Sequence, residues 1–391
     1  MKRVNICALL LALFGCSAEP EDPTPTLATS EDALHVRAFW RNWGREIFRH
    51  DTFGDEAHWT NTLRMHEVIA SAVDPTTALS VGLKVDADAL PPGILETVDL
   101  TDPKTTVALL ALDAVVGVKG QVSADGVLES VGITCALCHS IVDDSVAPGI
   151  GRRLDGYPNR DLDPGLILSL SPAFSEDQKQ VLRSWGKGHY DPRWSIDGIN
   201  APVLIPPAYG LKHVGRETYT GDGPISYWNA YVAVTQMGGQ GVFIDPRIGV
   251  SVVRRPDRVT PKLPALLAYQ LSLKAPAPPE GSFDETAAER GKLLFRGKAK
   301  CGSCHSGPAF TDARYRLHRA EEVGADPLYA SRTATKRYRT TPLRGAWQHA
   351  PYFHDGSAAT FADVVNHYDS HFELGLTQPE KSDLTEYLKS L

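Results

Sequence analysis

The sequence has no run of basic residues and, beyond its first residues, no long apolar run, and these absences exclude two kinds of function. Forty Lys and Arg stand against 47 Asp and Glu, a net charge of −7 over 391 residues. A mildly acidic chain without a basic run is a poor candidate for binding nucleic acid or an anionic membrane surface. The most apolar later stretch, Thr105 to Gly117, is short and interrupted by Asp113. It therefore predicts a core helix rather than a membrane span.

The overall composition is that of a globular chain, with 42% hydrophobic and 22% charged residues. The length predicts two or three domains.

The N-terminus predicts export. Lys2 and Arg3 precede an apolar stretch that ends at Phe14, too short to span a bilayer and typical of a signal peptide. The stretch leads into Gly15-Cys16, which resembles a bacterial lipobox with a lipidated cysteine. We expect a lipoprotein signal peptide over residues 1–16 and a flexible tether over residues 17–32. The protein would be periplasmic, held at the outer membrane only by lipid on Cys16; an ordinary signal peptide cut nearby is the alternative.

Cysteine is scarce, and its placement is informative. Two of the six cysteines lie within the first 16 residues, and the other four form the motifs Cys135-Ala-Leu-Cys138-His139 and Cys301-Gly-Ser-Cys304-His305. No cysteine remains for a disulfide outside these motifs. C-x-x-C-H attaches c-type haem through two thioethers, and its histidine ligates the iron. We predict two covalent haem c groups; a redox pair or half a zinc site are the alternatives, although neither needs the following histidine twice.

The chain repeats itself loosely. The segment Gly44 to Arg49 recurs as Gly291 to Arg296, and Ala268 to Leu273 recurs as Glu386 to Leu391. Each half predicts an opening helix, a haem motif, a loop-rich wrap and a closing helix. The expected fold is mainly α, with two cytochrome c-like domains at residues 33–275 and 285–391 and a proline-rich linker at residues 276–284.

The halves differ by an insertion of about 80 residues, roughly residues 51–129, ahead of the first motif. Within it, Trp59 to Ile69 predicts an amphipathic helix. In the second half, Ser282 with Glu285 and Thr377 with Glu380 predict capping boxes at two helix starts.

Several segments together resemble one family. They are Phe295 to Asp312, Thr340 to Gly345, Ala350 to Thr360, Asn200-Ala201-Pro202, Ser226-Tyr227-Trp228 and Gln236-Met237-Gly238. With them the chain resembles the bacterial di-haem cytochrome c peroxidase and MauG superfamily. The resemblance implies haem-dependent electron transfer or redox catalysis.

The resemblance also implies sixth ligands for the two irons. Tyr368 would ligate the second haem, with His367 as its local competitor. For the first haem, His189 and Met237 are rival ligands, and an open face is the third option. A sixth protein ligand makes an electron-transfer haem, whereas an open face can bind peroxide or dioxygen.

Further residues take roles from the same resemblance. Trp228 stands where the family has an electron-relay tryptophan between haems. Gln236 replaces the family's glutamate, and an amide cannot shuttle protons, which counts against peroxidase activity. Arg344 would pair with a haem propionate. Glu217 and Asp222 lie near in sequence and are the candidates to substitute for that glutamate, although we expect each to be a solvated loop charge. Ca²⁺ between the haems would be held through Asn200, Thr340 and Pro342.

Three functional interpretations stay open. The first is a di-haem oxidoreductase of the peroxidase or MauG type, and the second is a non-catalytic electron carrier. The third is an oxygenase-like haem protein whose substrate pocket is formed by the insertion. The expected partner is a small redox protein or a quinol-linked electron donor or acceptor.

Overall fold

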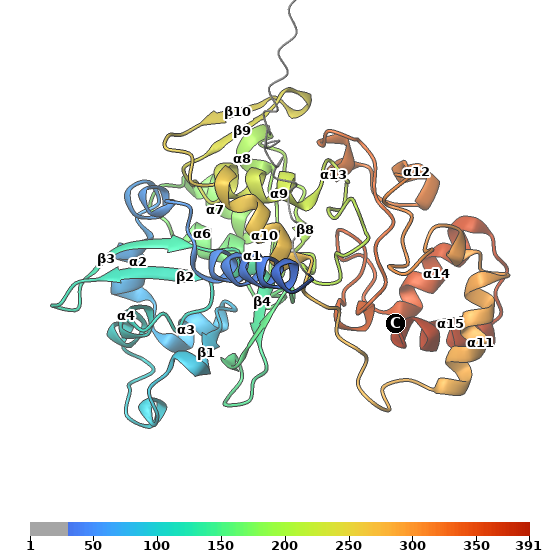
Figure 1. Ribbon diagram of the computed structural model, residues 1–391, viewed down its shortest axis with the longest axis horizontal. Coiled ribbons are helices and arrows are strands. Elements are labelled where there is room, and N and C mark those ends of the chain that lie inside the picture. The colour runs from blue at the N-terminus through green and yellow to red at the C-terminus, as the bar shows by residue number, and fades with distance from the viewer. Residues whose placement is uncertain (1–29) are drawn as a thin grey trace, which may run out of the picture.

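The computed structural model describes residues 30–391, and it is mainly helical, as the sequence predicts (Figure 1). The α-helices are α1 (Ser30–His50), α2 (Met65–Ala72), α3 (Pro75–Ser80), α4 (Pro103–Ala111), α5 (Ala136–His139), α6 (Pro164–Ser169), α7 (Glu176–Arg183), α8 (Trp194–Asp197), α9 (Ile225–Tyr231), α10 (Leu263–Gln270), α11 (Glu285–Arg296), α12 (Ala320–Val323), α13 (Leu328–Ser331), α14 (Phe361–Phe372) and α15 (Gln378–Lys389).

Short 3₁₀ and π turns join these helices. They are η1 (Ala57–Thr62), η2 (Ala87–Ala89), η3 (Ile94–Glu96), η4 (Val232–Gln236), η5 (Pro246–Ile248), η6 (Thr260–Lys262), η7 (Cys301–Ser303) and η8 (Ala346–Gln348). The first and fourth of these are π turns.

The strands of the described part are short and form two-stranded sheets. The pairs are β1 (Val85–Asp86) with β5 (Ile150–Gly151), β2 (Val118–Val122) with β3 (Leu128–Ile133), β4 (Ser140–Val142) with β6 (Arg153–Asp155), β7 (His189–Tyr190) with β8 (Val203–Leu204), and β9 (Val242–Asp245) with β10 (Val250–Val253). The first pair is parallel and the others are antiparallel.

Helices α1 and α10 cross at very close range, and glycine makes the crossing possible. A Cβ at Gly44 would lie 1.9 Å from the Ala265 carbonyl oxygen and 2.7 Å from the Tyr269 Cβ. One turn further along α1, the rings of Phe48 and Tyr269 meet edge to face with centroids 5.5 Å apart. The two segments that repeat in the sequence are therefore packed against each other in the first half.

The second half repeats this crossing with α11 and α15, which lie side by side at the right of Figure 1. A Cβ at Gly291 would lie 2.0 Å from the Asp383 carbonyl oxygen and 2.9 Å from the Tyr387 Cβ. The rings of Phe295 and Tyr387 meet edge to face at 5.2 Å. The internal repeat read from the sequence is thus a repeat of one helix-crossing geometry.

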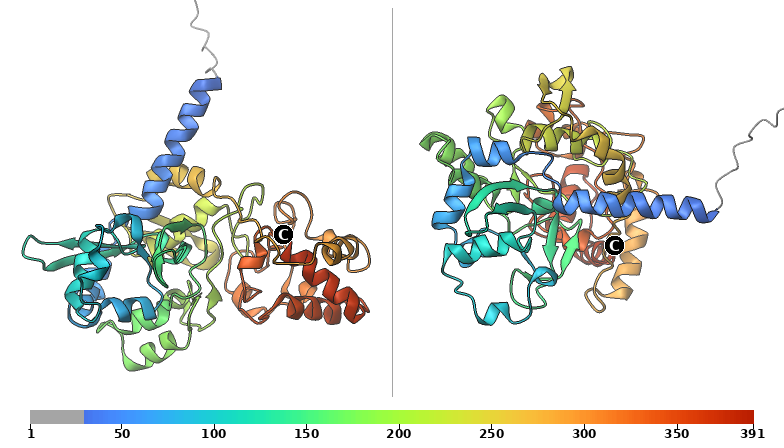
Figure 2. Two further views of the ribbon diagram at one scale, coloured as in Figure 1. Left: turned by 90° about the horizontal axis from the view of Figure 1, so that it is seen from below. Right: turned by 60° about the vertical axis from the view of Figure 1, so that its left-hand side comes forward.

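The region between α1 and the first C-x-x-C-H motif builds a core of its own. Helices α2 and α4 and the β2–β3 hairpin enclose buried side chains that include Met65, Leu110 and Val131. Figure 2 shows helix α1 projecting away from the part of the molecule that contains this region.

Three local predictions need correction. The helix predicted over Trp59 to Ile69 is broken, because η1 ends at Thr62 and Arg64 takes a left-handed conformation (φ 55°) before α2 begins. Helix α4 ends at Ala111, short of the predicted Gly117, and Asp113 is likewise left-handed. Helix α11 is capped by Asp284, which accepts from the Ala287 amide, and not by Ser282.

Other local predictions hold or lie beyond the described residues. The Thr377–Glu380 capping box is present at the start of α15. Between Gln270 and Glu285, where the linker is predicted, the chain forms neither helix nor strand. The predicted signal peptide, Cys16 and the tether up to residue 29 lie outside the described residues, and α1 begins at Ser30. Within residues 30–391, no helix combines the length and apolar character that crossing a bilayer requires.

The close crossing of α11 and α15 gives a stability prediction. Gly291→Ala should lower the free energy of unfolding by about 1–3 kcal/mol, because the methyl group would force the α15 backbone away. This loss should outweigh the roughly 1 kcal/mol by which alanine favours a helix over glycine. Urea unfolding of the full chain measures it. Thr286→Ala, at an exposed position of α11, is the matched control, and an equal effect of the two changes would contradict the close crossing.

Candidate functional site

The first C-x-x-C-H motif is fixed between a strand and a helix terminus. It follows β3 and forms the single turn α5. The hydroxyl of buried Thr134 donates to the Arg49 carbonyl at the end of α1 (3.1 Å) and accepts from the Ala136 amide (3.3 Å). A Cβ at Gly117 would lie 2.1 Å from the Leu137 amide nitrogen, so only glycine lets this part of the chain pass the motif.

The imidazole of His139 is prepared to act as a metal ligand. Its Nδ1 lies 3.0 Å from the Pro206 carbonyl oxygen, which leaves Nε2 as the free nitrogen. Burial lowers the pKa of His139 to about 4, so the ring is neutral at neutral pH and Nε2 carries a lone pair. Burial also raises the pKa of the Cys135 and Cys138 thiols to about 12.

The second motif repeats this arrangement behind α11. The His305 Nδ1 lies 3.1 Å from the Phe310 carbonyl oxygen, and burial lowers the pKa of His305 to about 4. Burial raises the pKa of the Cys301 thiol to about 11. The Phe295 ring at the helix crossing lies between the rings of His305 (6.3 Å) and Tyr387. The crossing of α11 and α15 therefore helps to position His305, the expected iron ligand.

A cavity of about 540 Å³ opens beside the first motif. This is within the range of about 300–1,000 Å³ typical of small-molecule and cofactor sites. Cys135, Cys138 and His139 line one part of it. Most of the wall is apolar, and it includes residues from the region between α1 and the motif, such as Met65 and Leu110. A large apolar group attached at the motif would be shielded from water there.

Three residues singled out in the sequence meet in this cavity. Trp228 on α9, Gln236 at the end of η4 and Met237 all line it. The Gln236 Oε1 accepts from the Tyr190 hydroxyl (2.9 Å), and its Nε2 donates to the Thr235 hydroxyl (2.9 Å). The Gln236 amide is therefore held in one orientation.

Met237 is itself anchored by a residue far away in the sequence. Its carbonyl oxygen accepts from the Trp59 indole Nε1 (3.0 Å), and Met237 is buried. Trp59 also lines the cavity. Trp59 thus fixes the segment that contains the candidate ligand Met237.

His189 lies outside the cavity wall that contains Met237. Its neighbour on β7, Tyr190, lines the cavity, and consecutive side chains of a strand point to opposite faces. The His189 Nδ1 lies 2.9 Å from the Lys187 carbonyl oxygen. Its Nε2 would be 3.3 Å from a Cβ at Gly356, in the second half.

Tyr368 on α14 lies near the second motif. Burial, together with the nearby Cys301 and Cys304 thiols, raises the pKa of its hydroxyl to about 12. Its neighbour His367 is aimed elsewhere, with Nε2 2.9 Å from where a Gly324 Cβ would lie. Of the two side chains, Tyr368 is the one beside the thiols.

Arg344 lies on the loop next to His305. Its Nε donates to the Pro308 carbonyl, and its guanidinium lies 5.7 Å from the centroid of the Phe310 ring. The side chain is exposed, which leaves its other donors accessible to an anionic group.

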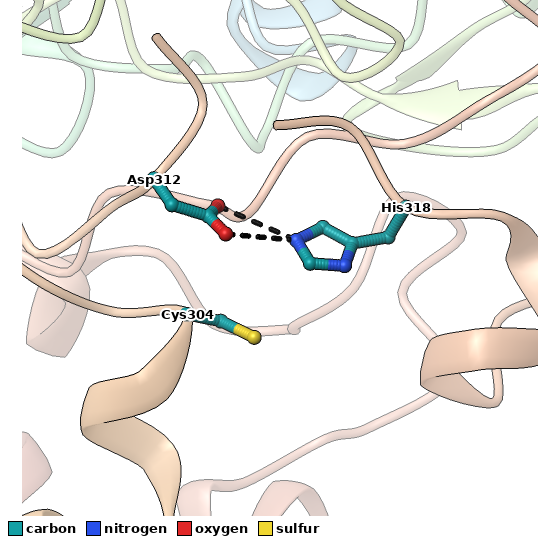
Figure 3. Close-up of side chains that lie close together, drawn as sticks. All are labelled: Cys304, Asp312 and His318. Atoms are coloured by element: carbon teal, nitrogen blue, oxygen red, sulfur yellow. Dashed lines mark hydrogen bonds and ion pairs between the residues drawn. The ribbon is translucent and has the colours of Figure 1, made fainter. Parts of the chain in front are cut away.

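A compact polar cluster adjoins the second motif. Figure 3 shows Cys304, Asp312 and His318 together, with one ligand atom from each within 4.8 Å of the others. The His318 Nε2 lies 3.1 Å from Asp312 Oδ2, and the Thr340 hydroxyl donates to Asp312 Oδ1 (2.6 Å). A metal ion here and a haem thioether would compete for the same sulfur.

The residues expected to hold Ca²⁺ are engaged in other contacts. The exposed Asn200 accepts from the Trp185 indole (2.9 Å) and donates to the Ser184 hydroxyl (3.2 Å). Thr340 belongs to the Asp312 cluster. Within residues 30–391, no hydrogen bond joins Asn200 to Thr340 or Pro342.

Sequence reasoning missed His58 as a residue of the site. His58 lines the cavity, and a Cβ at Gly238 would lie 2.5 Å from the His58 Cβ. Burial and Arg254 lower the pKa of His58. The glycine that follows Met237 was the available signal, since it allows a ring to pack against that backbone.

Glu217 and Asp222, expected as solvated charges, are buried. Glu217 lines the cavity and accepts from the Gly215 (3.1 Å) and Ile225 (2.9 Å) amides, the latter at the start of α9. Burial raises its pKa. Asp222 accepts from the Arg193 guanidinium (3.2 Å) and the Thr220 hydroxyl.

The residues present fit a covalent haem at each motif. Each motif supplies two thiols and a neutral imidazole whose Nδ1 is already engaged by a backbone carbonyl, and the first adjoins an apolar cavity of cofactor size. Cys135, Cys138 and His139 would hold one haem, and Cys301, Cys304 and His305 the other.

Parts of this chain are similar in sequence to known cytochromes and peroxidases. The family described as RoxA-like, cytochrome c-like matches residues 337–370. Methylamine utilization protein MauG of Methylorubrum extorquens is 31% identical over 150 residues, which cover 32% of this chain and 42% of that protein. Cytochrome-c peroxidase IdrP1 of Denitromonas iodatirespirans is 30% identical over 188 residues, which cover 34% of this chain and 50% of that protein.

Among solved structures, hydrazine synthase of Kuenenia stuttgartiensis aligns with a TM-score of 0.34 and 23% identity, covering 53% of this chain and 74% of that chain. The chain spans about half, or less, of the length of the curated relatives it matches.

Asp55, which supports the strand before the first motif, gives a pH prediction. It is fully buried and accepts from the Ile133 amide (3.3 Å), and burial raises its pKa from 3.8 to about 9. Between these pH values the folded chain holds one more proton than the unfolded chain, so stability falls as pH rises. The contribution approaches about 1.4 kcal/mol per pH unit. Urea unfolding of Asp55→Asn at pH 5 and pH 8 should show a flatter pH dependence than the unsubstituted chain.

The exposed Asp125, in the β2–β3 turn, provides the control for this experiment. Asp125→Asn should keep the unsubstituted pH dependence. If Asp55→Asn also keeps it, Asp55 is not the buried acid described here.

Proposed function

We propose that the chain is a di-haem c-type cytochrome, because it is similar to MauG and to cytochrome-c peroxidase IdrP1 and has a segment that matches the RoxA-like cytochrome c family. Its function would be electron transfer and haem-dependent redox catalysis of the peroxidase or MauG type. The two haems would sit in two cytochrome c-like domains, at residues 33–275 and 285–391, with residues 51–129 as an insertion in the first.

One observation carries this proposal: the same ligand geometry occurs twice. Each C-x-x-C-H imidazole is neutral, is held by a carbonyl at Nδ1, and belongs to a half with a glycine-dependent helix crossing. A zinc site would need the four thiols together, whereas each motif here has its own surroundings.

Bound haem would supply a one-electron iron couple at each motif. The chain's own residues define the environment of the first one. The apolar wall excludes water, Trp228 presents an indole to the cavity, and Gln236 offers a fixed amide. Glu217, with its raised pKa, is a buried acid that can hold a proton at the same cavity.

The sixth positions would differ between the two sites. Tyr368 beside the Cys301 and Cys304 thiols favours a tyrosine-ligated, electron-transferring second haem. At the first motif, Met237 lines the cavity and His189 does not, so the choice is between Met237 and an open face.

A second function is favoured by the cavity itself. Its apolar wall extends from the first motif to insertion residues such as Met65, Leu110 and Val131. An apolar substrate could be held there next to an open iron, as in an oxygenase-like protein.

The remaining proposals rest on the sequence alone. The chain would be exported to the periplasm and lipid-anchored at Cys16, and it would exchange electrons with a small redox protein or a quinol-linked partner. Arg344 would pair with a propionate, and Ca²⁺ between the haems is the least supported element, since Asn200 and Thr340 are engaged elsewhere.

Haem content tests the core of the proposal. The purified chain should carry two covalent haems, as measured by pyridine haemochrome absorbance and intact mass. Cys135→Ser with Cys138→Ser should remove one haem, and Cys301→Ser with Cys304→Ser the other. A chain that binds zinc in place of haem, or one that forms only disulfides, would refute the proposal.

Low-temperature EPR of the oxidised, haem-loaded chain tests the sixth ligands. We expect one high-spin signal, from the haem at His139, and one low-spin signal, from the haem at His305. Tyr368→Phe should alter only the second signal and raise that haem's potential, because a phenolate favours ferric iron. The control is Tyr315→Phe, at a highly exposed position. Two low-spin signals, in both the oxidised and the half-reduced state, would instead indicate an electron carrier.

A further inference from the structure

Three basic side chains, one half-buried and two buried, meet where the two halves of the chain join. The half-buried Arg160 follows Asn159, whose backbone amide donates to the Cys138 carbonyl (2.9 Å). Arg339 and His349 come from the second half, and both are buried. The Arg160 Nη2 donates to the His349 carbonyl (3.0 Å). Burial lowers the pKa of His349, and the positive charges of Arg160 and Arg339 lower it as well.

These side chains present donors that nothing in the described chain satisfies. Four atoms of this cluster are buried and have no hydrogen-bond partner among residues 30–391: Nε and Nη1 of Arg160, Nη1 of Arg339 and Nε2 of His349. Buried polar groups in proteins are nearly always hydrogen-bonded, and an unpaired buried donor costs about 1–3 kcal/mol. Several such donors in one place indicate a missing acceptor.

The charge in this region is also uncompensated. In the described part of the chain, no carboxylate forms an ion pair with Arg160 or Arg339. The nearest acid to act on Arg339 is Glu217, but both of its oxygens accept from backbone amides. Tyr219 adjoins both guanidinium groups and is neutral at neutral pH. Buried cations without a partner are strongly destabilising, so an anion is expected here.

We propose that Arg160, Arg339 and His349 form a carboxylate-binding site for the propionate groups of the haem attached at Cys135 and Cys138. This inference rests on the proposed haem at His139. Haem carries carboxylates on the edge opposite its thioether-forming vinyl groups, and guanidinium groups bind carboxylates through paired hydrogen bonds.

The position of the cluster favours the first haem. Arg160 directly follows Asn159, whose backbone amide donates to the Cys138 carbonyl of the first motif (2.9 Å). Arg339 and His349 extend the site into the second half. The propionates of one haem would therefore be held by both halves of the chain, and the second half would help to fix the first haem.

The test is a spectroelectrochemical titration of the haem-loaded full chain. Arg160→Gln and Arg339→Gln should each shift the midpoint potential of one haem to a lower value, because removal of a cation near the iron favours the ferric state. Arg152→Gln, the same change at an exposed position nearby, should leave both potentials unchanged. Redox-difference infrared spectra of chain carrying ¹³C-labelled propionates should show carboxylate bands that move in the first two variants only.

Each result decides the proposal. Unchanged potentials and carboxylate bands in both variants, with two haems bound, would overturn it while leaving the proposed function intact. Absence of haem at Cys135 and Cys138 would overturn both. If potentials of the unsubstituted chain respond to added chloride or phosphate through Arg160, the site binds a free anion and the proposal is wrong. Should a glutamine variant not fold, Arg160→Lys and Arg339→Lys keep the charge and should move the carboxylate bands with a smaller change in potential.

Discussion

The close contact of two helices, made without an intervening side chain, determines the rest of this structure. At Gly44 and at Gly291 a helix backbone meets the carbonyl of a partner helix, and the aromatic residue one turn later, Phe48 or Phe295, packs against a tyrosine of that partner. In the second half, the same Phe295 also lies near the His305 ring. In the first half, the carbonyl of Arg49 at the end of α1 holds Thr134 just before the motif. Each crossing thereby positions the residues of its own C-x-x-C-H motif.

The cavity at the first motif depends on residues that lie between α1 and that motif. Trp59 holds the Met237 carbonyl, and His58 packs on Gly238. The cavity wall is thus made by residues far apart in sequence, and its shape depends on the segment after α1 as much as on the motif. The second motif has no such addition, and its surroundings are the short loop around Phe310 and helix α14 with Tyr368. Two equal motifs are therefore placed in unequal environments.

Patterns that act over a few residues were readable from the sequence, and contacts between distant residues were not. The paired motifs, the repeated Gly44 and Gly291 segments and the Thr377 capping box depend on local chemistry. The break at Arg64 was missed because apolar spacing continues across it, while the backbone turns to bring Trp59 to Met237.

The buried charges were also missed, for the same reason. In the sequence, Glu217 and Asp222 resemble ordinary loop charges. Only in the folded chain does the Ile225 amide donate to Glu217 and the Arg193 guanidinium to Asp222. His58 and Arg160 carry no local pattern at all.

The two crossings differ in how far along the chain their partners lie. Helix α1 ends at His50 and its partner α10 begins only at Leu263, whereas α11 ends at Arg296 and α15 begins at Gln378. Closing a longer loop costs more conformational entropy, and contacts between distant segments form more slowly. The α11–α15 crossing can therefore form soon after its first helix is synthesised, whereas the α1–α10 crossing must wait until a much longer intervening segment has been synthesised. Cys135 and Cys138 accordingly spend longer in a chain that lacks its helix crossing than Cys301 and Cys304 do.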